Sequence, residues 1–181
     1  MTYIAFLRGI NVGGHRVTME VLRRLFAELG FTNVRTYIQS GNVFFDAPEQ
    51  DNRDHLIARI EQHLQQALGY AVPTFLRSPK ELEQLLALNP FRHLTVTDDM
   101  RLCLMFLTEP APIGLILPLR SPKADMEIVH LTDREAFVIW YIIDGRAPAT
   151  TTFLDKTLGR RTTTRFFPTA AKILEAVGKK P

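Results

Sequence analysis

The chain has a single cysteine and no long apolar run, and both shortages limit what it can be. One cysteine, Cys103, excludes an internal disulfide bond and a metal site built from several thiolates. No stretch approaches the roughly 20 apolar residues of a membrane helix. The apolar run at residues 3–7 is also too short for the core of a signal peptide. We therefore expect a cytoplasmic protein that does not associate with a membrane.

Histidine is also scarce, and its spacing argues against a metal centre. The five histidines form no close-spaced pattern, and His55 and His63, eight residues apart, have no third ligand nearby in the sequence. The G-x-G-x-x-G pattern of a dinucleotide site is absent as well. We predict no metal and no cofactor.

What remains is an ordinary globular composition with an uneven charge. The 181 residues are 46% hydrophobic and 23% charged, which suits one large domain or two small ones. From residue 145 onward there are eight basic and two acidic residues, a net charge of +6, which leaves −3 for the rest because the total is +3. A basic segment of this kind can attract phosphates, although a solvated charged surface explains it equally well.

Apolar periodicity in the first part of the chain predicts alternating strands and helices. The expected strands are residues 3–7, 34–39, 43–45 and 72–76. Thr18 is placed to cap a first helix that Gly30 ends, and Asp51 or Asn52 a second helix that Gly69 ends. The resulting β-α-β-β-α-β order is that of a ferredoxin-like half, which we assign to residues 1–78.

The second part, residues 79–181, reads as a degenerate α+β half packed on the first. Ser78 and Glu81 form a capping box for a helix to about Leu88. The other expected elements are strands at 101–107, 127–131 and 136–143, short helices between Pro110 and Pro122 and at 152–158, and a final helix at 168–177. Cys103 lies in an apolar strand, where a thiol is usually buried and unreactive.

The ferredoxin-like topology predicts where a ligand binds. It brings the loop from Arg8 to Gly14 beside the turn from Gln39 to Asn42, at one edge of the sheet. Glycine-rich backbone can direct several N–H groups at one anion, and an arginine adds a bidentate contact. The candidate ligand-binding residues are Arg8, Asn11, Gly13, Gly14, Gln39, Ser40 and Asn42, with Arg165 approaching from the second half.

Two simpler explanations of these loops remain open. The glycines can serve only to allow positive φ angles, and Gln39 to Asn42 can be only a hairpin turn. Gly9 to Gly14 has the G-x-x-x-x-G spacing of a phosphate loop, but His15-Arg16 replaces the lysine and hydroxyl residue that follow it. Residues 162–165, just before the final helix, suit N-capping as well as anion binding. Catalytic residues are unknown, because Ser40 lacks the nucleophile-elbow pattern and has only His15 as a base near that edge.

Three segments resemble a known bacterial family, the domain of unknown function 1697 family. They are residues 3–15, residues 31–43 and residues 158–165, so the resemblance spans nearly the whole chain. It implies an α+β protein with ferredoxin-like character and no established activity. One departure stands out, because the family usually follows its Thr-Thr-Arg with Asn-Trp, where this chain has Phe166-Phe167.

We therefore expect an uncharacterised cytoplasmic protein that binds a small anionic molecule bearing phosphate or carboxylate. One alternative is a nucleic-acid-binding protein that uses the basic C-terminal third. Another is an enzyme acting on a phosphorylated metabolite, for which no general base is evident.

Overall fold

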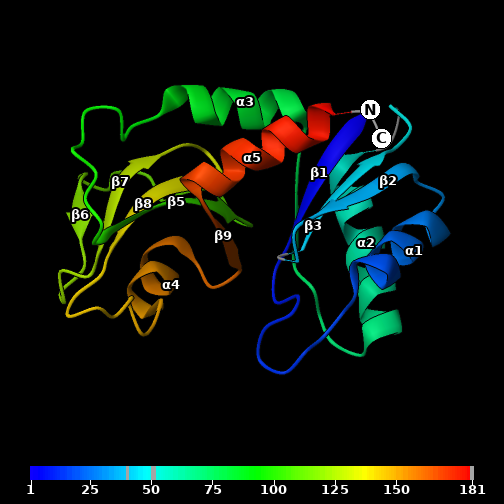
Figure 1. Ribbon diagram of the computed structural model, residues 1–181, viewed down its shortest axis with the longest axis horizontal. Helices are drawn as coiled ribbons and strands as arrows, with labels where there is room; N and C mark the ends of the chain where they lie inside the picture. Colours follow the sequence, from blue (N-terminus) through cyan, green and yellow to red (C-terminus); the bar gives the residue numbers. More distant parts are fainter. Residues whose placement is uncertain (40, 50–51, 180–181) are drawn as a thin grey trace. The chain divides into compact units, whose positions relative to one another are not determined.

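The computed structural model describes residues 1–39, 41–49 and 52–179 of the chain. Over these residues it forms nine strands and five helices in a mixed α+β fold with two antiparallel sheets (Figure 1). The α+β class expected from the sequence is confirmed. The chain divides into two compact units, one made of Met1–Gln84 with Lys172–Pro181 and the other of Leu85–Ala171.

The elements follow one another in regular order along the chain. The first unit contains β1 (Thr2–Leu7), α1 (Met19–Glu28), β2 (Thr32–Tyr37), β3 (Asn42–Asp46), α2 (Arg53–Leu68) and β4 (Thr74–Arg77). The second contains β5 (Met100–Leu107), β6 (Leu119–Arg120), β7 (Met126–Leu131), β8 (Glu135–Tyr141), α4 (Thr152–Leu158) and β9 (Thr162–Phe166).

Two helices, α3 (Pro79–Leu88) and α5 (Phe167–Gly178), have residues in both units. The sequence suggested a boundary after residue 78, where α3 begins. The compact units instead divide inside α3, after Gln84, and again inside α5, before Lys172. The start of a capped helix can be predicted from the sequence. The residue at which one continuous helix passes from one compact unit to the other cannot.

The first sheet has the strand order β2-β3-β1-β4, and all its pairs are antiparallel. Helix α1 therefore connects two strands of the same direction with β3 between them, and α2 connects two others with β1 between them. The register pairs Phe6 with Asn42 and Asn42 with Tyr37. The end of β1 thus lies beside the end of β2 and the start of β3, as the sequence predicted.

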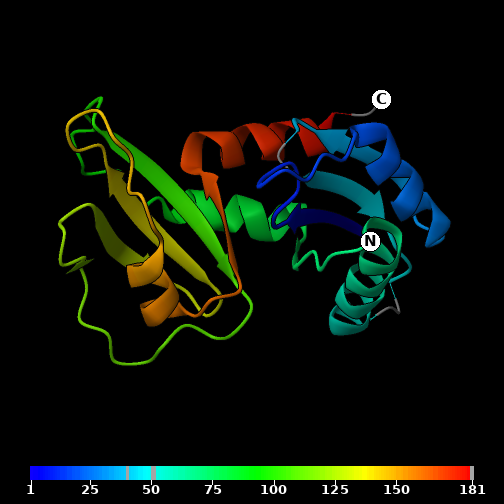
Figure 2. The same cartoon turned by 90° about the horizontal axis from the view of Figure 1, so that it is seen from below.

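Helices α1 and α2 cover the same face of this sheet (Figures 1 and 2). Their inward residues pack on alternate residues of β1, namely Tyr3, Ala5 and Leu7. The intervening residues Ile4 and Phe6, on the opposite face, are also fully buried. Burial on both faces explains why β1 reads as an unbroken apolar run instead of an alternating one.

Local capping signals in the sequence are confirmed at the helix starts. The Thr18 hydroxyl accepts from the Val21 N–H at 3.2 Å. Asn52 caps α2, while Asp51, its alternative, lies outside the described residues. At α3 the Ser78 N–H donates to a Glu81 carboxylate oxygen at 2.7 Å, and the Glu81 N–H donates to the Ser78 hydroxyl at 3.2 Å.

Several predicted boundaries are wrong. Strand β2 ends at Tyr37 instead of at Gln39, because Ile38 has a φ of +50° that no strand allows. No helix forms between Pro110 and Pro122, where four prolines remove backbone N–H donors; the segment contains the short strand β6 instead.

The segment from Thr162 to Phe166 was expected only to precede a helix, yet it forms strand β9. It pairs antiparallel with β5 at the edge of the second sheet, whose order is β6-β7-β8-β5-β9. Threonine favours strands, but its capping ability suggested the other role here. Thr162 and Thr163 are accordingly buried.

The second unit has its own apolar core beneath helix α4. Leu154 and Leu158 of this helix pack on the sheet together with Cys103, Met105 and Val138. Cys103 is fully buried, and burial raises the pKa of its thiol to about 12. The structural role expected for Cys103 is confirmed.

Arg35, on strand β2, holds the end of the chain to the first unit. Its guanidinium donates to the carbonyl oxygens of Ala176 at 3.3 Å and Val177 at 2.9 Å, and also to that of Lys179. It lies over the Phe44 ring, 5.4 Å from the centroid. The carbonyls at a helix end have no partner within the helix, so the Arg35 side chain caps the C-terminal end of α5.

Replacement of Arg35 by methionine should lower the free energy of unfolding by about 2 kcal/mol, because charged hydrogen bonds and a cation–π contact are both lost. Urea denaturation followed by circular dichroism measures this. Arg24→Met is the matched control, since the Arg24 side chain is 67% exposed on α1 and forms a surface ion pair with Glu28. Equal stability of the two variants would contradict the capping role.

Cys103 should not react with a thiol reagent such as DTNB in the native protein at pH 8. It should react fully in guanidinium chloride, because only unfolding exposes a thiolate there. Absorbance at 412 nm measures the reaction. Rapid labelling of the native protein at the rate of a free thiol would show that the β5 core opens.

Candidate functional site

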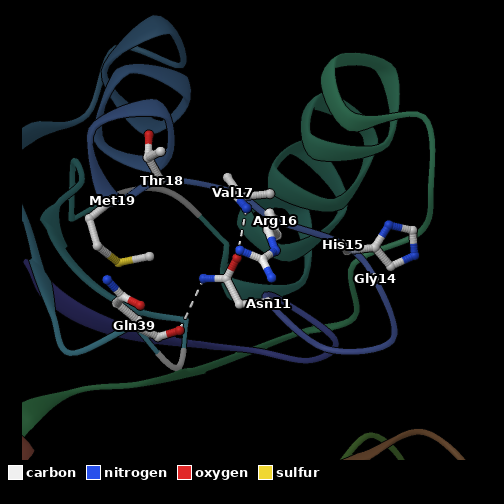
Figure 3. Close-up of a pocket in the computed structure, with 8 residues that line it drawn as sticks. All are labelled: Asn11, Gly14, His15, Arg16, Val17, Thr18, Met19 and Gln39. Atoms are coloured by element: carbon white, nitrogen blue, oxygen red, sulfur yellow. Dashed lines mark hydrogen bonds between the residues drawn. The ribbon is translucent and has the colours of Figure 1, made fainter.

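A cavity of about 540 Å³ lies where the β1–α1 loop of the first unit meets the β2–β3 turn (Figure 3). We call it the loop pocket. Its walls come from the glycine loop, residues 8–18 between β1 and α1, from the first residue of α1, and from the turn between β2 and β3. The lining residues are Asn11, Gly14, His15, Arg16, Val17, Thr18, Met19 and Gln39.

Asn11 joins the two loops through its side chain. Its Oδ1 accepts from the Val17 N–H at 2.6 Å, and its Nδ2 donates to the Gln39 carbonyl at 3.1 Å (Figure 3). Its own backbone has a φ of +59°, a left-handed conformation that asparagine tolerates better than most residues. Asn11 is therefore the residue that sets the shape of the pocket.

Gly41 brings the β2–β3 turn into close contact with β1. Its carbonyl accepts from the Leu7 N–H at 2.8 Å. A Cβ added at Gly41 would lie 3.1 Å from the Leu7 Cβ and 3.2 Å from the Ile10 Cβ, at a φ of +73°. Both the space and the backbone conformation therefore require glycine.

The charge at the pocket comes from Arg16. Its side chain is exposed, and within the described part of the chain no carboxylate forms an ion pair with it. The first acidic residue of the chain is Glu20, so the glycine loop is wholly basic or neutral. An unpaired guanidinium in a concave site favours an anion and can bind it with two parallel hydrogen bonds.

The start of α1 adds backbone donors to the same pocket. The Thr18 hydroxyl and carbonyl accept from Val21 and Leu22 respectively. The N–H groups of Met19 and Glu20 have no acceptor among the described residues, as is normal in a first helical turn. Together with the helix dipole they make this end of α1 electropositive.

His15 is held by an aromatic neighbour from another element. Its ring stacks on Tyr70, which follows α2, with centroids 3.7 Å apart and planes inclined by 24°. Burial raises the pKa of the Tyr70 hydroxyl. The His15 N–H also donates to the Val12 carbonyl at 3.2 Å, so the loop is tied at both flanks of Gly14.

Three of the residues proposed from the sequence line the pocket: Asn11, Gly14 and Gln39. Gly13 is exposed beside Gly14 but is not part of the lining, and Ser40 lies outside the described residues.

The two other proposed residues of the first unit also lie outside the lining. Arg8 is half-buried, and its backbone N–H donates to the Pro73 carbonyl at 2.9 Å. Asn42 is fully buried and donates to the Tyr37 carbonyl at 3.1 Å.

The sequence reasoning missed Arg16 as the charge at this edge. It favoured Arg8 because that residue directly follows β1. The useful signal was present, since the Thr18 cap showed that a helix begins just after Arg16. An arginine that lies just before a helix in the sequence must lie near the N-terminal end of that helix.

Arg165 belongs to β9 of the second unit. It is buried, and its guanidinium donates to the Thr163 hydroxyl at 3.0 Å and the Thr164 carbonyl at 2.8 Å. Burial lowers the pKa of Arg165 to about 10, so the group is still charged at neutral pH.

The pair that departs from the family pattern packs among other aromatic rings. Phe167 meets the Phe91 ring edge-on, with centroids 5.3 Å apart, and Phe166 meets Trp140 edge-on at 6.1 Å. The contact of Phe167 with the buried Phe91 stabilises the core, whereas Phe166 is 44% exposed.

The described residues contain neither a metal-binding cluster nor a membrane-spanning helix. The residues that the structure describes contain no group of three or more side chains able to hold a metal ion. Over the same residues, no helix combines the length and the apolar character needed to span a membrane.

Comparison with known proteins places the chain in a family. The model of the family described as protein of unknown function, DUF1697, matches residues 1–137. The chain belongs to the DUF1697 family. It is also similar to the solved structure of conserved bacterial protein SP0830 from Streptococcus pneumoniae, with 23% identity, a TM-score of 0.69 and coverage of 98% of each chain. That likeness supports the fold alone. No curated protein matches the chain.

Gly41→Ala should lower the free energy of unfolding by about 3 kcal/mol, from the left-handed strain and the steric contact with β1 together. Gly69→Ala is the matched control: its φ is +81°, but a Cβ there meets nothing within 4 Å, so we expect only about 1 kcal/mol. Urea denaturation measures both. Equal losses would show that the turn does not press on β1.

Proposed function

We propose that this DUF1697 protein binds a small anionic ligand in the loop pocket. The Arg16 guanidinium supplies the charge, and the N–H groups that open α1 supply further donors beside it. The observation that carries the proposal is an arginine that lines a cavity at the start of a helix and forms no ion pair with any carboxylate that the structure describes. Anions are stabilised by both features, and few other ligands are.

The remaining residues support this arrangement. Asn11 and Gly41 hold the two loops together, and Gln39 presents its amide to the ligand. We assign Arg8, Gly13 and Asn42 to shaping the loops, because none of them lines the cavity. The proposal does not require Arg165.

We also infer that the first unit is a ferredoxin-like domain. Its β-α-β-β-α-β element order and its strand order β2-β3-β1-β4 support this, because each helix crossover skips one antiparallel strand. A cytoplasmic location, also proposed here, agrees with a single unpaired cysteine.

Nucleic-acid binding through the basic C-terminal third has less support. Arg165 is buried, and the exposed basic residues are divided between the two units. Those in the second unit are Arg146, Lys156, Arg160 and Arg161, and those in the first are Lys172 and Lys179. Enzymatic action on a phosphorylated metabolite also remains a proposal, and within the described residues the pocket has only His15 as a general base.

The test is a calorimetric titration with phosphate, citrate and adenosine monophosphate at low salt. We expect at least one to bind the native protein and Arg16→Gln to weaken that binding about tenfold or more, since a charged hydrogen bond contributes roughly 1.5–3 kcal/mol. Arg24→Gln removes the same charge from the exposed face of α1 and should leave affinity within about twofold. No heat with any anion at millimolar concentration would refute the proposal.

A further inference from the structure

The loop pocket is larger than a simple anion requires. Its volume of about 540 Å³ lies within the roughly 300–1,000 Å³ that is usual for sites of metabolite-sized ligands. A tetrahedral oxyanion contacting Arg16 would leave most of that space unfilled. The pocket therefore has room for a ligand with a second part.

The lining changes in chemical character along the cavity. Arg16 and His15 come from the basic stretch of the glycine loop, while Gln39 and Met19 are neutral. In the view of Figure 3 the two neutral side chains lie at one side and His15 at the other, with Asn11 and Arg16 drawn between them. The Gln39 side-chain amide has no hydrogen-bond partner among the described residues, although its backbone carbonyl is held by Asn11.

We infer, on the basis of the proposed function, that the pocket binds an organic phosphate made of two parts. The phosphate lies against Arg16 and the backbone of Gly14, and a neutral hydroxylated portion lies against Gln39 and Met19. An amide both donates and accepts, so it suits hydroxyl groups, and a thioether adapts to an irregular apolar surface. Glycine backbone with φ of +62° at Gly13 and +93° at Gly14 allows close approach of a phosphate.

A matched panel of probes tests both parts of this ligand. The probes are glucose 6-phosphate, inorganic phosphate, glucose and gluconate, titrated into the full-length protein by calorimetry. Glucose 6-phosphate should bind about tenfold more tightly than inorganic phosphate. Glucose, which lacks the charge, should not bind detectably, and gluconate, a carboxylate of similar size, should bind more weakly than the phosphate ester.

Two variants assign the parts of the ligand to the two ends of the pocket. Arg16→Gln should weaken glucose 6-phosphate and inorganic phosphate by the same factor of about ten. Gln39→Ala should weaken only glucose 6-phosphate, by about fivefold, and leave inorganic phosphate unchanged. Both side chains are exposed, so neither variant should disturb folding, and thermal denaturation checks this.

The outcomes separate this inference from the proposed function. Equal affinity for glucose 6-phosphate and inorganic phosphate, or equal loss of both in Gln39→Ala, would overturn the two-part ligand while leaving anion binding intact. Tighter binding of gluconate would overturn the choice of phosphate. Failure of all the anions to bind would reject the proposed function itself.

Discussion

The antiparallel pairing of β1 with β3 is the constraint on which the candidate site depends. Its register sets Phe6 opposite Asn42, so the residues beyond β1 must leave the sheet beside the β2–β3 turn. Two segments about thirty residues apart in sequence meet for that reason alone. The hydrogen bond from Asn11 to Gln39 then fixes how they meet.

Where the glycine loop meets the β2–β3 turn, a fixed backbone conformation lies beside a charged side chain, Arg16. Asn11 occupies a left-handed conformation that costs a residue with a side chain free energy, whereas Gly41 occupies one that glycine adopts readily. Arg16, by contrast, extends from a tied loop, and no carboxylate among the described residues forms an ion pair with it. A shape that is held this firmly, with its charge left uncompensated, is suited to recognition of a partner from solution.

Much of the fold could be predicted from signals between residues close in sequence. The remainder depends on contacts between residues far apart in sequence, which the sequence does not show. The caps at Thr18, Asn52 and Ser78 depend on neighbours within three residues, so their sequence pattern is sufficient. Strand β9 is recognisable only through its pairing with β5, and its run of threonines resembles a cap. Likewise, Ile38 leaves β2 in a conformation that a β-branched residue rarely adopts, which no propensity anticipates.

The candidate site shows the same division. Topology alone predicted that the two loops converge, and Asn11, Gly14 and Gln39 proved to line the cavity. Which arginine faces that cavity depends on the path of the loop, and the path depends on the bonds made by the Asn11 side chain. The direction of a side chain in a loop is decided by such tertiary contacts. The Thr18 cap places Arg16 near the start of α1, but the sequence does not show that Arg16 lines the cavity and Arg8 does not.

The capping of α5 by Arg35 also has a consequence for biosynthesis. The carbonyls that Arg35 binds belong to Ala176, Val177 and Lys179, which are synthesised about 140 residues after Arg35 itself. The first unit is thus discontinuous along the polypeptide and can be completed only after the second unit, Leu85–Ala171, has been synthesised. Until α5 has been synthesised, the nascent chain exposes the edge strand β2, and the Arg35 guanidinium lacks these carbonyl acceptors.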